Sequence, residues 1–282
     1  MSNFIWINGK FLVQREAHVN VLTHSLQYSG AVFEGERSYN GKIFKFKEHT
    51  ARLLKSAEYM GLEIKYSVKE IKKATYELLK RNSLQDAYIR PFIWRGAESL
   101  KIYDSRLSNN MLISTFYSKN QFSNGLKLNL GKWCKPSAKS LPPQAKSSAH
   151  YAMATVSQIE SSRLGYDDSL ILDEEGYVAE CNVANIFFGK GRKIITPIAD
   201  RFLNGITRQA VIKMTKTLGF EVLEKRVSIE EITQYDYSFI TGTAREIAGI
   251  GSINLNKSII KFFDHEQKVK LFQSAFIKLV GK

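Results

Sequence analysis

Two Asn-Gly pairs near the start of the chain, Asn8-Gly9 and Asn40-Gly41, each stand between short runs of apolar residues. Asn and Gly readily adopt the positive φ angles of a two-residue type I′ turn, so each pair predicts a tight β-hairpin. The first stretch of the chain is therefore predicted to form β-hairpins. A small sheet of this kind must cover one face with another layer to be stable.

The next two segments are predicted to be helices. Residues 47–62 and 67–82 both carry apolar residues at helical spacing. The first segment stops at Gly61, and the second opens with Ser67 and Glu70 in the pattern of a capping box. Residues 86–96 and 109–118 return to strand character, so the first part of the chain is predicted to be α+β.

The polar, glycine-terminated stretch 119–125 is the expected connection between two domains, 1–118 and 126–282. We expect a small α/β N-terminal domain and a larger, strand-rich C-terminal domain with helices packed on it, which carries Lys146. The second domain is predicted to contain strands within 126–134, 169–189, 193–197, 221–228 and 237–247, and helices from after Lys146 to about Arg163, at 207–219 and at 265–280.

The formal net charge of +14 raises the question of nucleic-acid binding. Because the basic residues are spread along the chain and no zinc-finger, RNP-like or basic-region pattern occurs, we do not expect nucleic acid to be the main partner. No apolar run suits a membrane span, and no signal peptide is recognised. Two cysteines suit a reducing cytoplasm, and no metal-binding spacing of histidines appears.

The sequence around Lys146 bears on the function of this residue. The stretch "LPPQAKSSAHYAMATVSQIE" puts it between a proline-bearing loop and a predicted amphipathic helix, among alanine and serine. Small neighbours let a flat ligand approach the backbone, so Lys146 is either an ordinary loop lysine or the anchor of an aldehyde cofactor. Such a cofactor, pyridoxal phosphate, also needs a carboxylate for its ring nitrogen, a donor for its phenolic oxygen and an anion site for its phosphate.

The carboxylate and the donor each have a candidate. Glu180 stands in the apolar strand pair "GYVAECNVANIFF", where a buried carboxylate requires a cation or hydrogen-bond donors. The competing interpretation is an edge glutamate that faces water. Tyr151 follows Lys146 by five residues and could donate to the phenolic oxygen, or it could be a half-buried core tyrosine.

The phosphate has three candidate partners. Gly205, Ile206 and Thr207 begin a predicted helix, whose free N–H groups and dipole favour an anion. Thr243 lies in a Gly-Thr turn after a strand, and Arg52, on the first predicted helix, offers a guanidinium that binds oxyanions bidentately. For Thr207 the competing interpretation is a threonine N-cap with no ligand, and for Arg52 it is a solvated surface arginine.

In order and spacing these segments resemble the fold-type IV pyridoxal-phosphate enzymes, and among them the branched-chain amino acid aminotransferases. The resemblance covers nearly the whole chain and is strongest in the Lys146 loop, "VAECNVANIFF", "GITR" and "GTAREI". It implies a two-domain fold like that of D-amino acid aminotransferase. It also implies a homodimer in which the partner lends a loop to the site.

The resemblance assigns a role to each candidate. Lys146 would be the Schiff-base lysine and would then move the substrate's Cα proton. The cofactor-binding set would be Arg52, Lys146, Tyr151, Glu180, Ile206, Thr207 and Thr243. The substrate-binding set would be Tyr28, Phe33, Tyr88, Arg90 and Ala244.

The implied reaction is ping-pong transamination of Leu, Ile or Val with 2-oxoglutarate, which gives branched 2-oxo acids and glutamate. "AYIRP" favours the branched-chain enzymes, as does the lack of an Arg-x-His pair in "WRGAESLKI". Ser147, Ser148, His150 and Asn204 depart from the family pattern, and several of the departures line or adjoin the expected substrate pocket. The alternatives are D-amino acid aminotransferase, aminodeoxychorismate lyase and a non-catalytic binding protein on the same fold.

Overall fold

The computed structural model divides by its contacts into two compact units. The first contains Met1–Lys119 and Ala145–His150, and the second contains Asn120–Gln144 and Tyr151–Lys282. The short segment with Lys146 therefore groups with the first unit, whereas we expected it in the C-terminal domain. The structure describes residues 3–119, 123–256, 258–263 and 265–282.

The predicted domain boundaries, at residues 118 and 126, stay a prediction. Part of the predicted connection, residues 120–122, lies outside the described residues.

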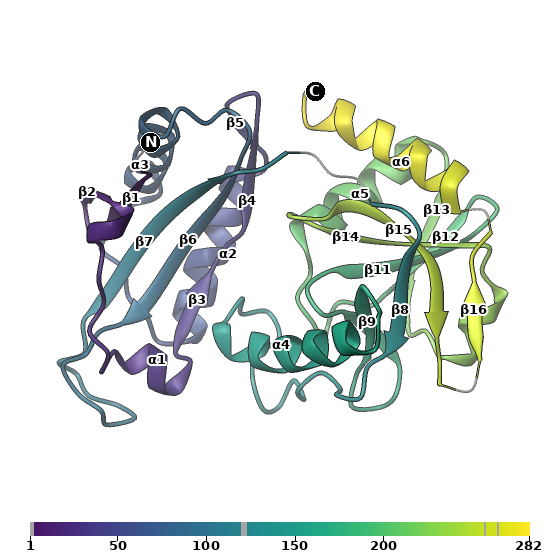
Figure 1. Cartoon of the computed structure of the whole chain (residues 1–282), viewed down its shortest axis with the longest axis horizontal. Coiled ribbons are helices and arrows are strands. Elements are labelled where there is room, and N and C mark those ends of the chain that lie inside the picture. Colours follow the sequence, from purple (N-terminus) through teal and green to yellow (C-terminus); the bar gives the residue numbers. More distant parts are fainter. Residues whose placement is uncertain (1–2, 120–122, 257, 264) are drawn as a thin grey trace. The chain divides into compact units, whose positions relative to one another are not determined.

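The first unit is built on an antiparallel sheet of seven strands among the described residues, in the order β2-β1-β7-β6-β4-β5 with β3 beside β6 (Figure 1). Its strands are β1 (Phe4–Ile7), β2 (Lys10–Val13), β3 (Ala31–Phe33), β4 (Glu36–Tyr39), β5 (Lys42–Ile43), β6 (Ala87–Arg95) and β7 (Asn109–Tyr117). Asn8 and Gly9 have φ angles of 48° and 91°, and Asn40 and Gly41 have 49° and 76°. Both predicted hairpin turns are thus confirmed.

Two long helices, α2 (Phe46–Tyr59) and α3 (Val68–Arg81), pack against this sheet. The capping box at the start of α3 is present, because Ser67 Oγ accepts from the Glu70 backbone N–H and Glu70 accepts from the Ser67 N–H. The helices bury Leu53 and Leu78 completely in the core that they share with the sheet. The short helices η1 (Gln14–Glu16) and α1 (His24–Tyr28) were not predicted.

The second unit contains a mixed sheet of nine strands among the described residues, in the order β10-β9-β8-β15-β14-β11-β12-β13 with β16 beside β15. Its strands are β8 (Leu126–Leu130), β9 (Asp168–Leu172), β10 (Val178–Cys181), β11 (Asn185–Lys190), β12 (Lys193–Pro197), β13 (Glu221–Lys225), β14 (Tyr237–Gly242), β15 (Glu246–Asn254) and β16 (Ile259–Lys261). Its helices are α4 (Ser148–Arg163, of which the first three residues belong to the first unit), α5 (Ile206–Thr217), η2 (Glu230–Gln234) and α6 (His265–Leu279). In the part of the chain that the structure describes, no helix has the length and apolar character needed to cross a membrane.

Both faces of this second sheet are buried at its centre. Ile186 and Phe188 of β11 belong to the core on one face. Phe187 points to the other face, where its ring stacks on Phe239 of β14 at 4.8 Å, and Phe239 lies 5.3 Å from Phe272 of α6. A strand buried on both faces needs consecutive apolar residues, which explains the run "IFF" at 186–188.

One long strand, β15, was missed from the sequence. Its segment "AGIGS" carries two glycines, which weaken a strand pattern. The structure gives a reason for one of them, because a Cβ on Gly251 would lie 2.9 Å from the Cα of Gly125, beside the parallel neighbour β8. Gly251 is therefore required by the close approach of two backbones and not by a turn.

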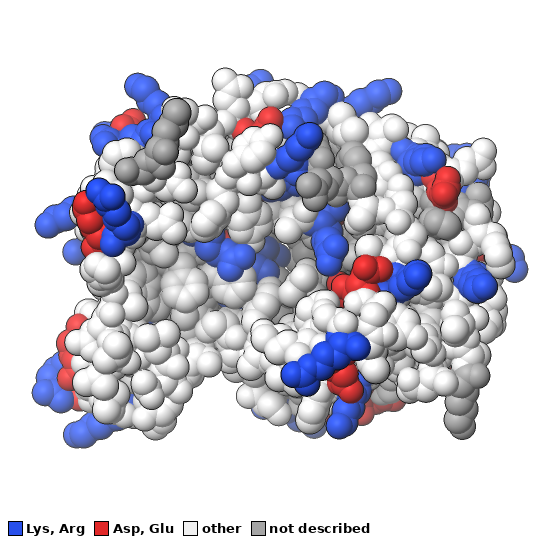
Figure 2. Space-filling view, viewed as in Figure 1, with Lys and Arg blue, Asp and Glu red and all other residues white. Residues whose placement is uncertain are grey.

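The positive charge is dispersed over the face shown in Figure 2, where Lys and Arg form separate groups and several lie beside Asp or Glu. Exposed pairs such as Lys45–Glu48 at 2.7 Å and Arg81–Glu77 at 2.9 Å are of this kind. The expectation that nucleic acid is not the main partner stays a prediction.

We predict that Phe272→Ala lowers the free energy of unfolding by about 3–5 kcal/mol, because Phe272 is fully buried against three aromatic rings. The adjacent Leu271→Ala is the matched control, since Leu271 is 44% exposed, and should cost less than about 1 kcal/mol. Denaturant unfolding followed by circular dichroism measures both. Equal losses would contradict the packing described for α6.

Candidate active site

Lys146 lies where the loop meets α4, as predicted, and its backbone is held on both sides. Its N–H donates to Ser56 Oγ at 2.9 Å, and its carbonyl oxygen accepts from the Phe33 N–H at 3.1 Å. The next residue, Ser147, forms an isolated antiparallel bridge with Val32. The loop is thus bonded to the edge of β3 like a short added strand, which fixes the point from which the lysine side chain extends.

Four of the predicted residues meet around Phe33 in the first unit. The Lys146 Nζ lies 5.0 Å from the centre of the Phe33 ring, and the Arg90 guanidinium lies 4.5 Å from it. Arg90 also donates to the Tyr88 hydroxyl at 2.7 Å. Gly35 was missed from the sequence, yet a Cβ there would lie 2.2 Å from the Tyr88 hydroxyl oxygen. An amine, an apolar ring and a guanidinium therefore share one small region.

Tyr28 has a different environment. It is 45% exposed at the end of α1, and its hydroxyl donates to the Leu100 carbonyl at 2.9 Å. Among the described residues, this hydrogen bond ties Tyr28 to the loop at 97–108. Its predicted place in the substrate pocket stays a prediction.

Arg52 is fixed by a buried carboxylate. Its Nε and Nη2 donate to the two oxygens of Glu34 at 2.5 and 2.9 Å, and His49 Nδ1 lies 2.7 Å from Glu34 Oε2. Burial raises the pKa of Glu34, but the charges and hydrogen bonds of Arg52 and His49 outweigh burial and hold that pKa well below its usual range. The interpretation of Arg52 as a solvated surface arginine is therefore wrong.

A second carboxyl group, Glu36, lies near this pair and behaves in the opposite way. It is 1% exposed, and in the described part of the chain its Oε2 has no hydrogen-bond partner. Burial, and then repulsion by the Glu34 carboxylate, raise the pKa of Glu36 well above its usual value. One of the two neighbouring carboxyl groups is thus ionised, while the other is held towards its protonated form.

In the second unit, Glu180 is buried and paired. Its Oε1 accepts from the ammonium of Lys135 at 2.7 Å and its Oε2 from the side-chain amide of Asn185 at 3.0 Å. Glu180 is 6% and Lys135 8% exposed. The interpretation of Glu180 as an edge glutamate in water is therefore wrong. Removing one partner from a buried pair of this kind typically costs about 3–5 kcal/mol.

Asn185 connects this carboxylate to the start of α5. Its Oδ1 accepts from the Gly205 N–H at 3.1 Å, and a Cβ on Gly205 would lie 2.2 Å from the same oxygen. Gly205 is the N-cap of α5, so the N–H groups of Ile206 and Thr207 lie in the first turn, which has no acidic residue. Such N–H groups have no partner within their helix and suit an anion. The structure thus brings Glu180 and the predicted phosphate site together.

The remaining predicted residues lie at two other places in the second unit. Tyr151 is half-buried on α4 and lines a groove of about 590 Å³ with Asn182 and Val183, which follow the Glu180 strand. Thr243, half-buried, and Ala244, exposed, form the turn between β14 and β15. A positive φ of 53° at Glu246, just after this turn, is uncommon for a non-glycine residue. Contacts between these residues and a ligand stay a prediction.

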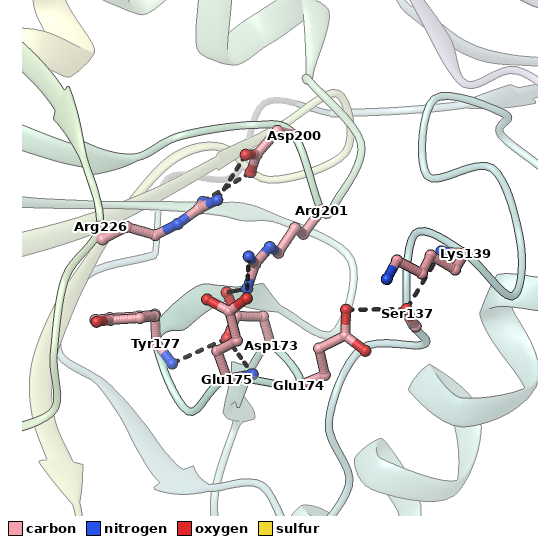
Figure 3. Close-up of polar contacts among 9 residues, drawn as sticks. All are labelled: Ser137, Lys139, Asp173, Glu174, Glu175, Tyr177, Asp200, Arg201 and Arg226. Carbon is pink, nitrogen blue, oxygen red and sulfur yellow. Dashed lines mark hydrogen bonds and ion pairs between the residues drawn. The ribbon is translucent and has the colours of Figure 1, made fainter.

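A network of polar contacts joins three segments of the second unit beyond the buried pair (Figure 3). Arg201 donates to Asp173 at 3.1 Å and to Glu175 at 2.5 Å. Ser137 donates to Glu174 at 2.9 Å. The network therefore ties the loop that carries Lys135 and the segment before α5 to the turn that leads into β10.

Sequence reasoning missed the partners that hold the predicted residues in place. For Arg52 these are Glu34 and His49, and for Glu180 they are Lys135 and Asn185. Asn185 leaves a signal, because it interrupts an apolar strand only five residues after Glu180. Lys135 leaves none, since it lies 45 residues from Glu180 in a loop with several other lysines.

The family model described as "Amino-transferase class IV" matches residues 31–253. A protein of Rickettsia felis named "Probable branched-chain-amino-acid aminotransferase" is 53% identical over 93% of this chain and 91% of its own length. The "Branched-chain-amino-acid aminotransferase" of Pseudomonas aeruginosa is 34% identical over 90% and 85%. The solved branched-chain amino acid aminotransferase of Thermobaculum terrenum, in its PLP form, has a TM-score of 0.88 and 29% identity, covering 99% of this chain and 94% of its own.

We predict that Glu36→Gln stabilises the protein, and more so as the pH rises. Above the ordinary pKa of about 4.3, the unfolded state releases the Glu36 proton. In the folded state the pKa of Glu36 is raised, so the chain must keep or take up that proton when it folds. The stability gained by Gln should therefore be near zero at pH 4 and grow by up to about 1.4 kcal/mol per pH unit until the folded-state pKa is reached.

Thermal unfolding between pH 4 and pH 8 measures this gain. Glu63→Gln, at an exposed position of the same unit, controls for the loss of one negative charge. A gain that shrinks as the pH rises would show that Glu36 is ionised in the folded protein.

Proposed function

Since the chain belongs to the class IV aminotransferases, we propose that it transfers the amino group of Leu, Ile or Val to 2-oxoglutarate. The observation that carries the proposal is the grouping of Lys146, Phe33 and Arg90. The Phe33 ring offers an apolar wall to a branched side chain. The Arg90 guanidinium offers a charge partner to the second carboxylate of 2-oxoglutarate or glutamate. One pocket then serves both substrates in turn.

The cofactor is pyridoxal 5′-phosphate, and the residues present are chemically suited to it. The buried Glu180 carboxylate, paired with Lys135 and Asn185, suits a protonated ring nitrogen. The first turn of α5 suits the phosphate. We propose that Arg52 and Thr243 also bind the phosphate and that Tyr151 donates to the phenolic oxygen. When bound, the cofactor supplies an aldehyde and an electron-accepting ring.

The side chain of Lys146 would act first as the covalent anchor and then, once the substrate amine has displaced it, as a base. Its neutral amine would take the proton from the substrate Cα, hold it as an ammonium and then release it. The Phe33 ring centre, 5.0 Å from Nζ, lies within cation–π distance of that ammonium. The backbone bonds on both sides of Lys146 keep this movement confined to the side chain.

We also propose that the protein works as a homodimer. Two loops of the first unit, 17–28 and 97–108, are joined by the Tyr28–Leu100 bond and by His24 Nε2, which lies 3.1 Å from the Lys101 carbonyl oxygen. Both loops expose large apolar side chains: Val21, Leu22, Leu26, Leu100, Ile102 and Tyr103. An exposed apolar surface on two bonded loops is typical of a protein interface. A second copy covering it would bring Tyr28 close to the partner's substrates.

A cytoplasmic location is also proposed. Both cysteines are free thiols, Cys134 exposed and Cys181 buried. An exposed free thiol persists best in a reducing compartment.

We predict that the protein loaded with pyridoxal phosphate forms glutamate from 2-oxoglutarate with Leu, Ile and Val. Lys146→Ala should lower this rate by roughly 10³-fold or more, because the anchor and the base are lost together. Lys139→Ala, at an exposed position, should leave it unchanged. Glutamate release over a panel of L- and D-amino acids is the measurement. Faster turnover of D-amino acids would favour the D-amino acid aminotransferase alternative instead.

For the dimer, we predict that Ile102→Asp produces monomers, because Ile102 is 74% exposed on the apolar loops and a carboxylate there would have to be desolvated. Leu164→Asp, at a 61% exposed site of the second unit, is the control and should leave the dimer intact. Analytical ultracentrifugation distinguishes the two states. A wild-type chain that sediments as a monomer would contradict the proposal.

A further inference from the structure

We infer that Lys135 is a positioning residue for Glu180, keeping its carboxylate ionised and oriented to accept a hydrogen bond from the ring nitrogen of the cofactor. This inference rests on the role proposed for Glu180. It concerns a residue that touches neither substrate nor cofactor in the proposal and acts through its neighbour.

The geometry around Glu180 gives each of its oxygens a different donor. Lys135 Nζ donates to Oε1 at 2.7 Å, and Asn185 Nδ2 donates to Oε2 at 3.0 Å. Asn185 is itself held, because its amide also donates to the Leu203 carbonyl oxygen at 3.0 Å. The plane of the carboxylate is therefore fixed from two sides. A carboxylate has about four lone-pair sites, so two protein donors are compatible with a third from a ligand.

Charge explains why one of the two donors is a lysine. A carboxylate as deeply buried as Glu180 favours its protonated form unless a cation offsets the loss of water. Asn185 is neutral and cannot offset a charge. A protonated carboxyl would present an O–H donor and one weaker acceptor, which binds a ring N–H less strongly than a carboxylate does. The Lys135 ammonium preserves the stronger acceptor.

The loop of Lys135 is anchored next to the strand that carries Glu180. The Lys135 N–H donates to the Leu172 carbonyl oxygen at 2.8 Å, at the end of β9. Two residues later, Ser137 donates to Glu174 in the turn between β9 and β10 (Figure 3). The register of this strand pair is irregular between Val178 and Glu180. Lys135 thus extends from a loop that is hydrogen-bonded to the β9–β10 hairpin, which carries Glu180.

The competing interpretation is an ion pair that only stabilises the fold. Both interpretations predict that loss of Lys135 lowers stability, so stability cannot separate them. They differ in ligand discrimination. A positioning role predicts that Lys135 governs how strongly the protein distinguishes a ring nitrogen from a ring carbon, whereas a purely structural role predicts no effect on that distinction.

The test compares the dissociation constants of two probes, pyridoxal phosphate and its 1-deaza analogue, in which C–H replaces the ring nitrogen. Both probes react with Lys146 through the same aldehyde, so the ratio of their constants isolates the ring atom. Equilibrium dialysis at pH 7 with cofactor-free full-length protein gives the ratio. For the wild-type chain we expect pyridoxal phosphate to bind about 10- to 100-fold more tightly, as for a hydrogen bond to a charged group.

Four variants complete the experiment. Lys135→Met and Lys135→Gln should each reduce the ratio by roughly tenfold, since a neutral hydrogen bond replaces a charge-assisted one. Lys135→Gln keeps an N–H donor, so it remains informative if Lys135→Met does not fold. Lys135→Arg keeps the charge and should retain the wild-type ratio. Lys139→Met, an exposed lysine of the same loop, is the matched control.

Each outcome has one meaning. A wild-type ratio near one would show that Glu180 does not contact the ring nitrogen, which refutes the proposed role of Glu180. A high wild-type ratio that persists in Lys135→Met and Lys135→Gln would leave Glu180 in place and overturn the role of Lys135. A ratio that falls in these two variants and returns in Lys135→Arg supports the inference.

Discussion

The buried hydrogen-bonded chain from Lys135 through Glu180 and Asn185 to Gly205 is the interaction on which the second unit's site depends. It places a negative charge inside a sheet and stabilises it with one cation and one amide. It also ties that charge to the first turn of α5, where positive partial charge is concentrated. A zwitterionic ligand with a cationic ring at one end and a phosphate at the other matches this arrangement of opposite charges.

The first unit follows the same principle with the signs reversed. There the cation, Arg52, is the group expected to meet a ligand, and buried Glu34 and His49 hold it. Glu36 beside them is held towards its neutral form, which avoids a second negative charge in the same region. In both units, a charged side chain that we propose contacts the ligand is paired with a buried side chain of opposite charge. Pairing of this kind lowers the cost of ordering the site when the ligand binds.

Local features of this protein were predictable because neighbouring residues decide them. The Asn8-Gly9 turn, the Ser67–Glu70 capping box and the start of α5 after Gly205 all depend on contacts within a few residues, and all are present. The order of the lysine loop, "VAECNVANIFF", "GITR" and "GTAREI" was enough to recognise the family, and the family match over residues 31–253 confirms the resemblance. Lys146 was proposed as the anchor because of its small neighbours and its place before a helix.

By itself, then, the sequence determined the turns, the helix starts, the family and the residues proposed to do the chemistry. Tertiary structure alone decided which residues hold them, because those contacts join distant parts of the chain. Lys135 is 45 residues from Glu180 in the sequence. Glu34 is 18 residues from Arg52, with which it forms an ion pair. Tertiary structure also decided that Gly251 belongs to a strand pressed against Gly125. Periodicity and turn chemistry act over a few residues, whereas burial and charge compensation depend on the whole packed sheet.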